Sequence, residues 1–182
     1  MRTLTFATMT ALAALSAANL MGTASASTSP LVVQGNGLRQ LHLGTSESRT
    51  VTVLDQLLGR PTAKVAPTPM MKNCGVDSLG YWYALGAYFK HNRLVGLSFG
   101  PAHVPAVQTV AGLRLGDALS RARSLYAHQF TTSNANGGAW FVTTATGRVD
   151  GFLNVNGALA PSATSTIMTI DVGDVGCPSM SP

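Results

Sequence analysis

Residues Gly96–Gly100, GLSFG, match the pattern Gly-x-Ser-x-Gly, which in some hydrolases carries a serine nucleophile. Such a serine lies at a sharp turn between a strand and a helix, where its hydroxyl is exposed. A strand pattern precedes Ser98, but Pro101 and Pro105 follow it. The residue before a proline is biased away from helical angles. We therefore interpret Ser98 as a strand residue, with a small hydrolase that uses Ser98 or a carboxylate pair as the alternative.

The other residues needed for catalysis or metal binding are scattered. In the order serine, acid, histidine, His128 follows Asp117 and no histidine follows Asp150. The histidines form no H-x-x-x-H pair, and the chain has no C-x-x-C motif, so we expect no metal site and no cofactor. Asp171 and Asp174 could together bind calcium, although two acids among glycines are more often turn residues.

Aromatic residues gather in one segment. It contains Tyr81, Trp82, Tyr83, Tyr88 and Phe89, and Trp140 and Phe141 follow later. On a strand Tyr81 and Tyr83 share one face and Trp82 lies on the other. We assign the two tryptophans to the core. Tyr81, Tyr83 and Tyr88 are candidate binding residues for a protein or glycan, with core packing as the alternative.

The two cysteines, Cys74 and Cys177, predict one disulfide if the chain is exported. A bridge across about a hundred residues would stabilise the fold by roughly 4–5 kcal/mol in the loop-closure model. A catalytic thiol and a pair of metal ligands are the alternatives.

The first 26 residues resemble an export signal. Arg2 is followed by an uncharged apolar stretch, and Ala24-Ser25-Ala26 fits the cleavage rule. The alternatives are a membrane anchor or an N-terminal core helix. No cysteine follows the apolar stretch, and no later segment reaches the roughly 20 apolar residues of a membrane span. We therefore expect a secreted protein, extracellular or associated with the cell wall, without a stable membrane anchor.

The charge of the chain is moderately positive. Twelve Lys and Arg face seven Asp and Glu, and loss of Arg2 with the leader leaves 11 − 7 = +4. The basic residues are scattered, so nucleic-acid binding is not expected, because tracking phosphates requires clustered charge. Weak attraction to an anionic cell envelope is consistent with this balance.

Two segments begin alike and predict helices. In the first, Leu41-His42-Leu43-Gly44 leads to Thr45 or Ser46 as cap, and the helix should end at Gly59 before Pro61. Its apolar side has helical spacing: Val51, Leu54, Leu57 and Leu58. In the second, Leu113-Arg114-Leu115-Gly116 leads to Asp117 as cap, before an apolar face of Leu119, Ala122, Leu125 and Tyr126.

Strands are predicted after each helix. The first pair is 81–89 and 93–99, joined by a turn at His91-Asn92, and the second is 140–144 and 148–155. The return strands RLVGLSF and RVDGFLN align Gly96 with Gly151. A last strand at 165–172 should join the same sheet.

These elements predict a single α+β domain at 38–182, preceded by a flexible arm at 27–37. Two loose repeats, 38–100 and 109–172, would each supply a helix and a β-hairpin to one antiparallel sheet. One face of the sheet would carry the helices. The other would be partly open or covered by the long loop at 61–73.

The repeated pattern resembles small exported actinobacterial proteins of unknown function. More distantly it is similar to the tandem-repeat β-lactamase inhibitory proteins and to small outer-membrane assembly lipoproteins. The matching residues are Leu41, Leu43, Gly44, Thr45, Leu54 and Gly59, then Leu113, Leu115, Gly116, Asp117 and Leu125. The inhibitors have disulfides within each repeat, and the lipoproteins start with a lipidated cysteine, where this chain has Ser27. The resemblance implies a helical pair on a sheet and protein binding through a sheet face.

The function expected from the sequence is therefore non-enzymatic. We expect a secreted protein that binds another protein or a cell-envelope component through a sheet face.

Overall fold

The computed structural model describes residues 29–59, 61, 63–101, 106–134, 138–155 and 160–175. The predicted leader and Cys177 lie outside these residues. The described chain is a mixture of helices and mostly antiparallel strands, which confirms the α+β class predicted from the sequence.

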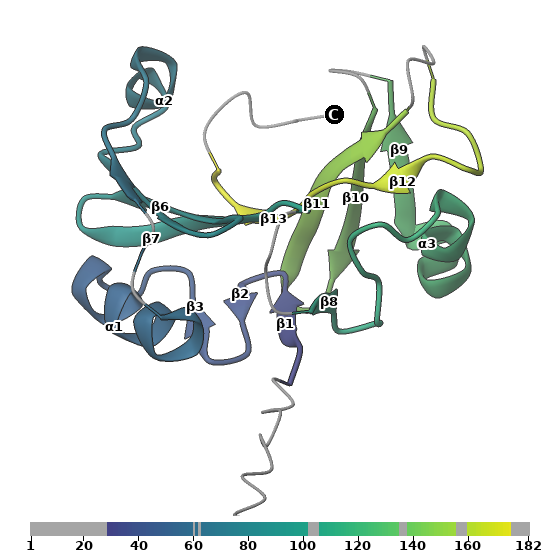
Figure 1. Cartoon of the computed structure of the whole chain (residues 1–182). Coiled ribbons are helices and arrows are strands. Elements are labelled where there is room, and N and C mark those ends of the chain that lie inside the picture. Colours follow the sequence, from purple (N-terminus) through teal and green to yellow (C-terminus); the bar gives the residue numbers. More distant parts are fainter. Residues whose placement is uncertain are drawn as a thin grey trace, which may run out of the picture.

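A nine-stranded sheet, here called the main sheet, forms the body of the molecule (Figure 1). All of its strand pairs are antiparallel. The last strand joins the main sheet, as the sequence predicted, and the structure places it between the return strands of the two hairpins. In spatial order the strands are β4 (Ala63–Val65), β5 (Ser78–Trp82), β6 (Leu85–Lys90), β7 (Arg93–Phe99), β13 (Ile170–Gly173), β11 (Gly147–Asn154), β10 (Ala139–Thr144) and β9 (Phe130–Ser133), and β12 (Thr166–Ile167) pairs with β11.

A second, four-stranded sheet was not predicted. Its order is β3 (Leu41–His42), β2 (Gly37–Leu38), β1 (Leu31–Gln34) and β8 (Val107–Thr109), and β1 and β8 run parallel. The flexible arm expected at 27–37 is therefore wrong from residue 31 onward, where β1 begins. Leu31 and Val33 alternate into the core, which fixes this segment as a strand.

The helices largely follow the sequence expectations. They are α1 (Glu47–Leu58), α2 (Pro69–Asn73) and α3 (Leu119–Tyr126), followed by the 3₁₀-helix η1 (Ala127–Gln129). Gly59 ends α1 with a φ of 84°. Asp117 does not cap α3, because Ala118 occupies that position. Instead, the Asp117 carboxylate accepts hydrogen bonds from the Arg114 backbone N–H and from the Arg121 guanidinium.

The starts of α1 and α3 are fixed by the same backbone hydrogen bonds. Before α1, the N–H of Gly44 donates to Leu94, and Leu94 donates back to Thr45. Before α3, the N–H of Gly116 donates to Ile167, and Ile167 donates back to Asp117. Each helix therefore begins where its preceding chain is tied to a strand.

The aromatic segment at 81–89 contains a turn that was not predicted from the sequence. The expected strand 81–89 is two strands, β5 and β6, because the chain reverses at Tyr83 and Ala84. Tyr83 has a φ of 57°, in the left-handed region. Trp82 and Leu85, on either side of the turn, are fully buried.

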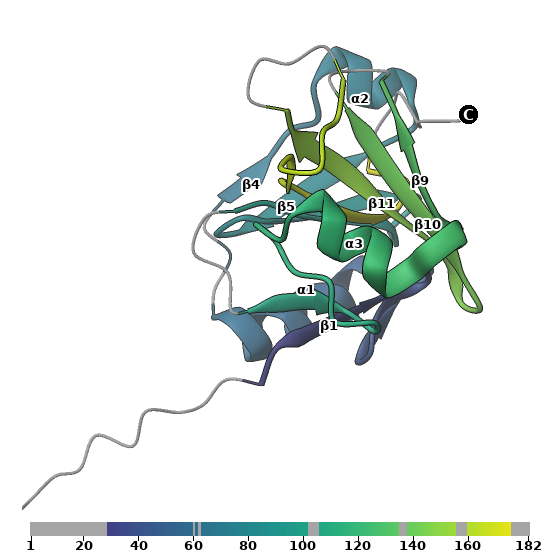
Figure 2. The same cartoon turned by 90° about the vertical axis from the view of Figure 1, so that its right-hand side faces the viewer.

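The core lies between the main sheet, the small sheet and helices α1 and α3 (Figures 1 and 2). Trp82 and Trp140 both lie in it, as predicted. Figure 1 shows α2 on the opposite side of the main sheet from α1. The face away from α1 and α3, here called the outer face, carries a smaller apolar cluster of Val76, Leu79 and Tyr88.

Candidate functional site

The strands bring three chemically relevant side chains into one row on the outer face. Ser98 on β7 is paired with Asp171 on β13. Asp171 is paired with Asp150 on β11. Directly paired residues share one face of a sheet, so this row continues to Phe141 on β10. The sequence interpretation of Ser98 as a strand residue is confirmed.

Ser98 has an acid as its hydrogen-bond partner. Its Oγ donates to Asp171 Oδ1 at 2.5 Å. Among the described histidines, His42 is on β3 of the small sheet and His128 is in η1. His91 is in the turn at the opposite end of β7 from Ser98. His103 lies outside the described residues. A histidine that could take the Ser98 proton is therefore missing from the described part of the chain.

Asp171 is the most perturbed carboxyl in the row. It is only 3% exposed, and burial raises its pKa from 3.8 to about 6. Hydrogen bonds from Ser98 and from Thr169 Oγ1, the latter 2.9 Å from Oδ2, act against this rise. The nearby charge of Asp150 adds to it. Both oxygens of Asp171 are thus occupied by hydroxyl donors.

Asp150 and its neighbours form the more accessible end of the row. Its carboxylate Oδ2 lies 3.0 Å from Arg148 Nε, and their side chains are 18% and 32% exposed. Burial raises the pKa of Asp150, and the Arg148 charge and hydrogen bond oppose this rise. The Arg148 guanidinium carbon lies 4.3 Å from the Phe141 ring centroid, a cation–π contact.

The chemistry open to this row differs between its two ends. A catalytic carboxyl must touch the substrate, and the oxygens of Asp171 face only protein hydroxyls. The Ser98–Asp171–Thr169 end is therefore a buried polar link between strands. The Arg148–Asp150–Phe141 end can make charged and aromatic contacts with a partner.

Of the three tyrosines proposed for binding, Tyr81 and Tyr88 share one cluster, and Tyr83 lies apart from them. Tyr88 is 8% exposed and packs in the outer-face cluster, where burial raises its pKa to about 12. Tyr81 is half-buried and packs against the same cluster, as does Met71 of α2. Tyr83 stands apart in the β5–β6 turn and is 57% exposed.

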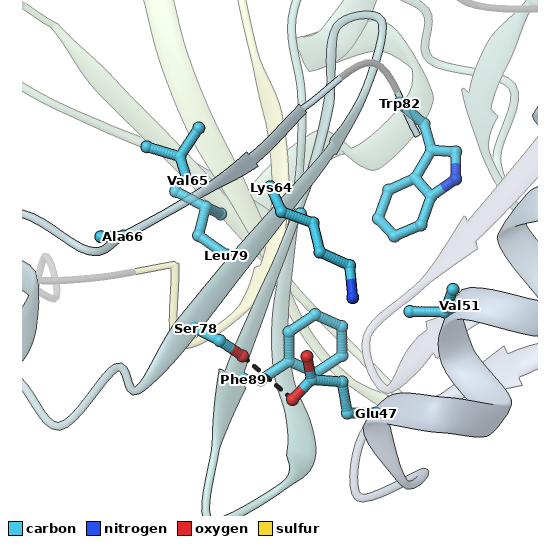
Figure 3. A pocket seen from close by; sticks show the side chains of 10 residues that line it. Glu47, Val51, Lys64, Val65, Ala66, Ser78, Leu79, Trp82 and Phe89 are labelled. Atoms are coloured by element: carbon cyan, nitrogen blue, oxygen red, sulfur yellow. Dashed lines mark hydrogen bonds between the residues drawn. The ribbon is translucent and has the colours of Figure 1, made fainter. Parts of the chain in front are cut away.

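A pocket on the opposite side of the main sheet was not predicted. It has a volume of about 200 Å³ and lies between α1, the edge strand β4 and its neighbour β5 (Figure 3). Trp82 and Phe89 form its floor, and Glu47 and Lys64 enter it from opposite walls. The only signal in the sequence was that Glu47 is the single glutamate of the chain.

The structure offers no support for a metal centre within the residues that it describes. No group of three His, Cys, Asp or Glu comes together there. The calcium pair considered for Asp171 and Asp174 meets the same difficulty as catalysis, since the Asp171 oxygens are already hydrogen-bonded. Cys74 caps the C-terminus of α2, and its predicted partner Cys177 lies outside the described residues.

Comparison with known proteins identifies no relative. A scan of family models, a search of curated proteins and a search of solved structures each give no match. In the described part of the chain, no helix is long and apolar enough to span a bilayer.

Proposed function

We propose that this protein is an exported, non-enzymatic binding module. Its binding surface is the outer face over β9, β10 and β11, and its partner is a protein or a cell-envelope component. The leader 1–26 is removed on export. The single observation that carries the proposal is the Arg148–Asp150–Phe141 cluster on that face.

The cluster has the character of a binding anchor. Arginine and aromatic residues are enriched among the residues that dominate protein interfaces. Arg148 is held in place by the Asp150 carboxylate and the Phe141 ring, so little side-chain freedom remains to be lost on binding. Exposed Thr131 and Thr143 add hydroxyls on the same face.

The distribution of charge favours an anionic partner. Most acidic side chains serve as internal acceptors or ion-pair partners: Glu47 for Ser78, Asp55 for Trp82, Asp77 for the His91 N–H, Asp117 for Arg121, Asp150 for Arg148 and Asp171 for Ser98. Several basic side chains are exposed instead: Arg39, Arg49, Lys64, Lys72 and Arg123. These residues lie outside β9, β10 and β11, so they give the molecule a general attraction to anionic groups that weakens in salt, and they are not part of the proposed binding surface.

Two finer features of the fold belong to the same proposal. The chain consists of two related helix-and-hairpin units, which is supported by the matching hydrogen bonds at the starts of α1 and α3. A disulfide between Cys74 and Cys177 ties the C-terminal tail to α2. Both features would give a small exported domain a rigid sheet for binding.

The experiment is a binding assay on the producing organism's own purified cell walls and secreted proteins. We expect the mature protein to bind, and Arg148→Gln/Phe141→Ala to lose at least about tenfold in affinity. The matched control is Arg123→Gln, which removes an exposed arginine on α3. Tyr83→Ala tests the exposed tyrosine separately. Equal binding by the double variant and the wild type would contradict the proposed surface.

The hydrolase alternative has its own test. A serine-reactive probe should not label the folded protein, because the Ser98 hydroxyl donates to a buried carboxyl. Labelling that disappears in Ser98→Ala would overturn the non-enzymatic proposal.

A further inference from the structure

We propose that the pocket between α1 and strands β4 and β5 binds a free α-amino acid with an apolar side chain. The pocket is on the opposite side of the main sheet from the Arg148 cluster. It is therefore a second site, and its occupation does not depend on the proposed binding surface.

The pocket exists because Gly80 has no side chain. Gly80 lies on the same face of β5 as Ser78 and Trp82, and it is paired with Lys64 on the edge strand. A methyl group at Gly80 would lie 2.8 Å from the Trp82 ring. The space of about 200 Å³ is smaller than the roughly 300–1,000 Å³ of pockets for drug-sized ligands. This size suits a molecule as small as an amino acid.

The floor of the pocket accepts an apolar group. Trp82 and Phe89 are 0% and 1% exposed, and Val51 of α1 forms one wall. The Trp82 Nε1–H donates to Asp55 Oδ1 at 2.8 Å, so the indole presents only its carbon surface to the pocket. A charged group placed on this floor would be desolvated without a partner. The ligand must therefore enter with its apolar part first.

The rim carries one group of each charge. Glu47 reaches in from the first turn of α1, and its Oε2 accepts a hydrogen bond from Ser78 Oγ at 3.0 Å. Lys64 reaches in from β4, and Figure 3 shows its ammonium group directed toward the space above Phe89. Ion pairs within the described residues join Arg121 to Asp117 and Arg148 to Asp150, and Glu47 and Lys64 are not paired with each other.

These charges select a zwitterion. The Glu47 carboxylate can accept hydrogen bonds from an α-ammonium group, and Lys64 can donate to an α-carboxylate. A simple amine or a simple carboxylic acid would match only one of the two. With the apolar floor, this arrangement describes an α-amino acid such as leucine.

The test compares L-leucine with analogues that each lack one feature. Isothermal titration of the full mature protein, followed also by tryptophan fluorescence of a Trp140→Phe variant in which only Trp82 remains, should show binding of leucine. Isoamylamine lacks the carboxylate, isocaproate lacks the ammonium group, and glycine lacks the side chain. Each should bind at least about tenfold more weakly. Absence of leucine binding at millimolar concentration, or equal binding of an analogue, would overturn the assignment.

Variants at the rim test the residues directly. Glu47→Gln retains an acceptor for Ser78, and Lys64 is exposed, so neither change should prevent folding. Each should weaken leucine binding by about tenfold or more. Lys72→Gln, at an exposed lysine of α2, is the matched control and should bind as the wild type. Wild-type affinity for leucine in both rim variants would contradict the proposed roles of Glu47 and Lys64 in binding the ammonium and carboxylate groups.

Discussion

Asp171 shows how one buried carboxyl can link neighbouring strands of a sheet. It receives hydroxyl hydrogen bonds from Ser98 on β7 and from Thr169 just before its own strand, while Asp150 lies opposite it on β11. The hydrogen bonds stabilise the ionised form, but desolvation outweighs them, so the pKa rises. The carboxyl therefore links the strands at an electrostatic cost near neutral pH.

This cost predicts a specific pH dependence of stability. Between pH 3.8 and about 6, the native protein holds a proton on Asp171 that the unfolded chain has lost. The Asp171 contribution to the free energy of unfolding therefore falls as pH rises through this window and is fully lost above it. Asp171→Asn removes the titration. Relative to this variant, the wild type should gain about 2 kcal/mol between pH 7.5 and pH 4.5 in urea unfolding.

Two details make this measurement decisive. Burial also raises the pKa of Asp150, but Asp150 is present in both proteins and largely cancels in the comparison. Ser98→Ala removes a hydrogen bond that lowers the pKa of Asp171, so the fall in stability should extend to higher pH. Parallel pH profiles for wild type and Asp171→Asn would show that Asp171 titrates normally.

The contact between Ser98 and Asp171 could be predicted only in part from the sequence. The strand character of Ser98 followed from the prolines after it. Its partner Asp171 is 73 positions away, and only the register between β7 and β13 places the two together. The pocket depends in the same way on Gly80 facing Lys64 across an edge strand that was expected to be a loop.

At the scale of elements, two turns hold the sheets together by close backbone contact. Gly35, in the turn between β1 and β2, packs on Gly147 at the β10–β11 turn. The Gly35 N–H also donates to Thr146 Oγ1 at 3.0 Å. A methyl group on Gly35 would lie 2.3 Å from the Gly147 carbonyl carbon, so the two backbones could not keep this distance.

We therefore predict that Gly35→Ala destabilises the protein by about 2 kcal/mol or more, because two backbone segments must separate. Gly100→Ala is the matched control. Neither glycine has a left-handed φ, and the nearest neighbour of a methyl on Gly100, the Ala84 oxygen, is 3.7 Å away. Its effect in urea unfolding should stay within about 0.5 kcal/mol. Equal effects of the two substitutions would contradict the proposed packing of the turns.

The elements that the sequence predicted correctly have strong local signals. Helix α1 has an apolar side with helical spacing and a glycine at its end, and the His91-Asn92 turn joins β6 to β7 with both residues at positive φ. Strands of two to four residues, such as β1, β2, β3 and β8, are too short to show a period. The pairings of β1 with β2 and of β2 with β3 are local, but β1 also pairs with β8, more than seventy positions away. The parallel pairing of β1 with β8 is therefore the part of the second sheet that the local sequence does not predict.

In the molecule as a whole, the C-terminal segment joins the two halves of the main sheet. The last strand, β13, joins β7 to β11, so the two hairpins form one sheet only when the C-terminal segment is in place. Just beyond β13, the backbone of Asp174 packs directly on Gly96 of β7. A methyl group added to Gly96 would lie only 2.2 Å from the Asp174 carbonyl oxygen. Val175 packs against the cluster of Val76, Leu79 and Tyr88. Any covalent link in this tail would therefore hold the central strand of the sheet.

The proposed Cys74–Cys177 disulfide would be such a link. Cys74 ends α2, which lies over the same outer face as the cluster that Val175 contacts. Thiol titration of the denatured, unreduced protein should find no free thiol, and mass spectrometry should show a mature chain that begins at Ser27. Reduction, or Cys74→Ser/Cys177→Ser, should lower the free energy of unfolding by roughly 4–5 kcal/mol, because the unfolded chain regains the entropy of a loop of about a hundred residues. Two free thiols would contradict the bridge. Unchanged stability after reduction would show that β13 is held by its strand pairing alone.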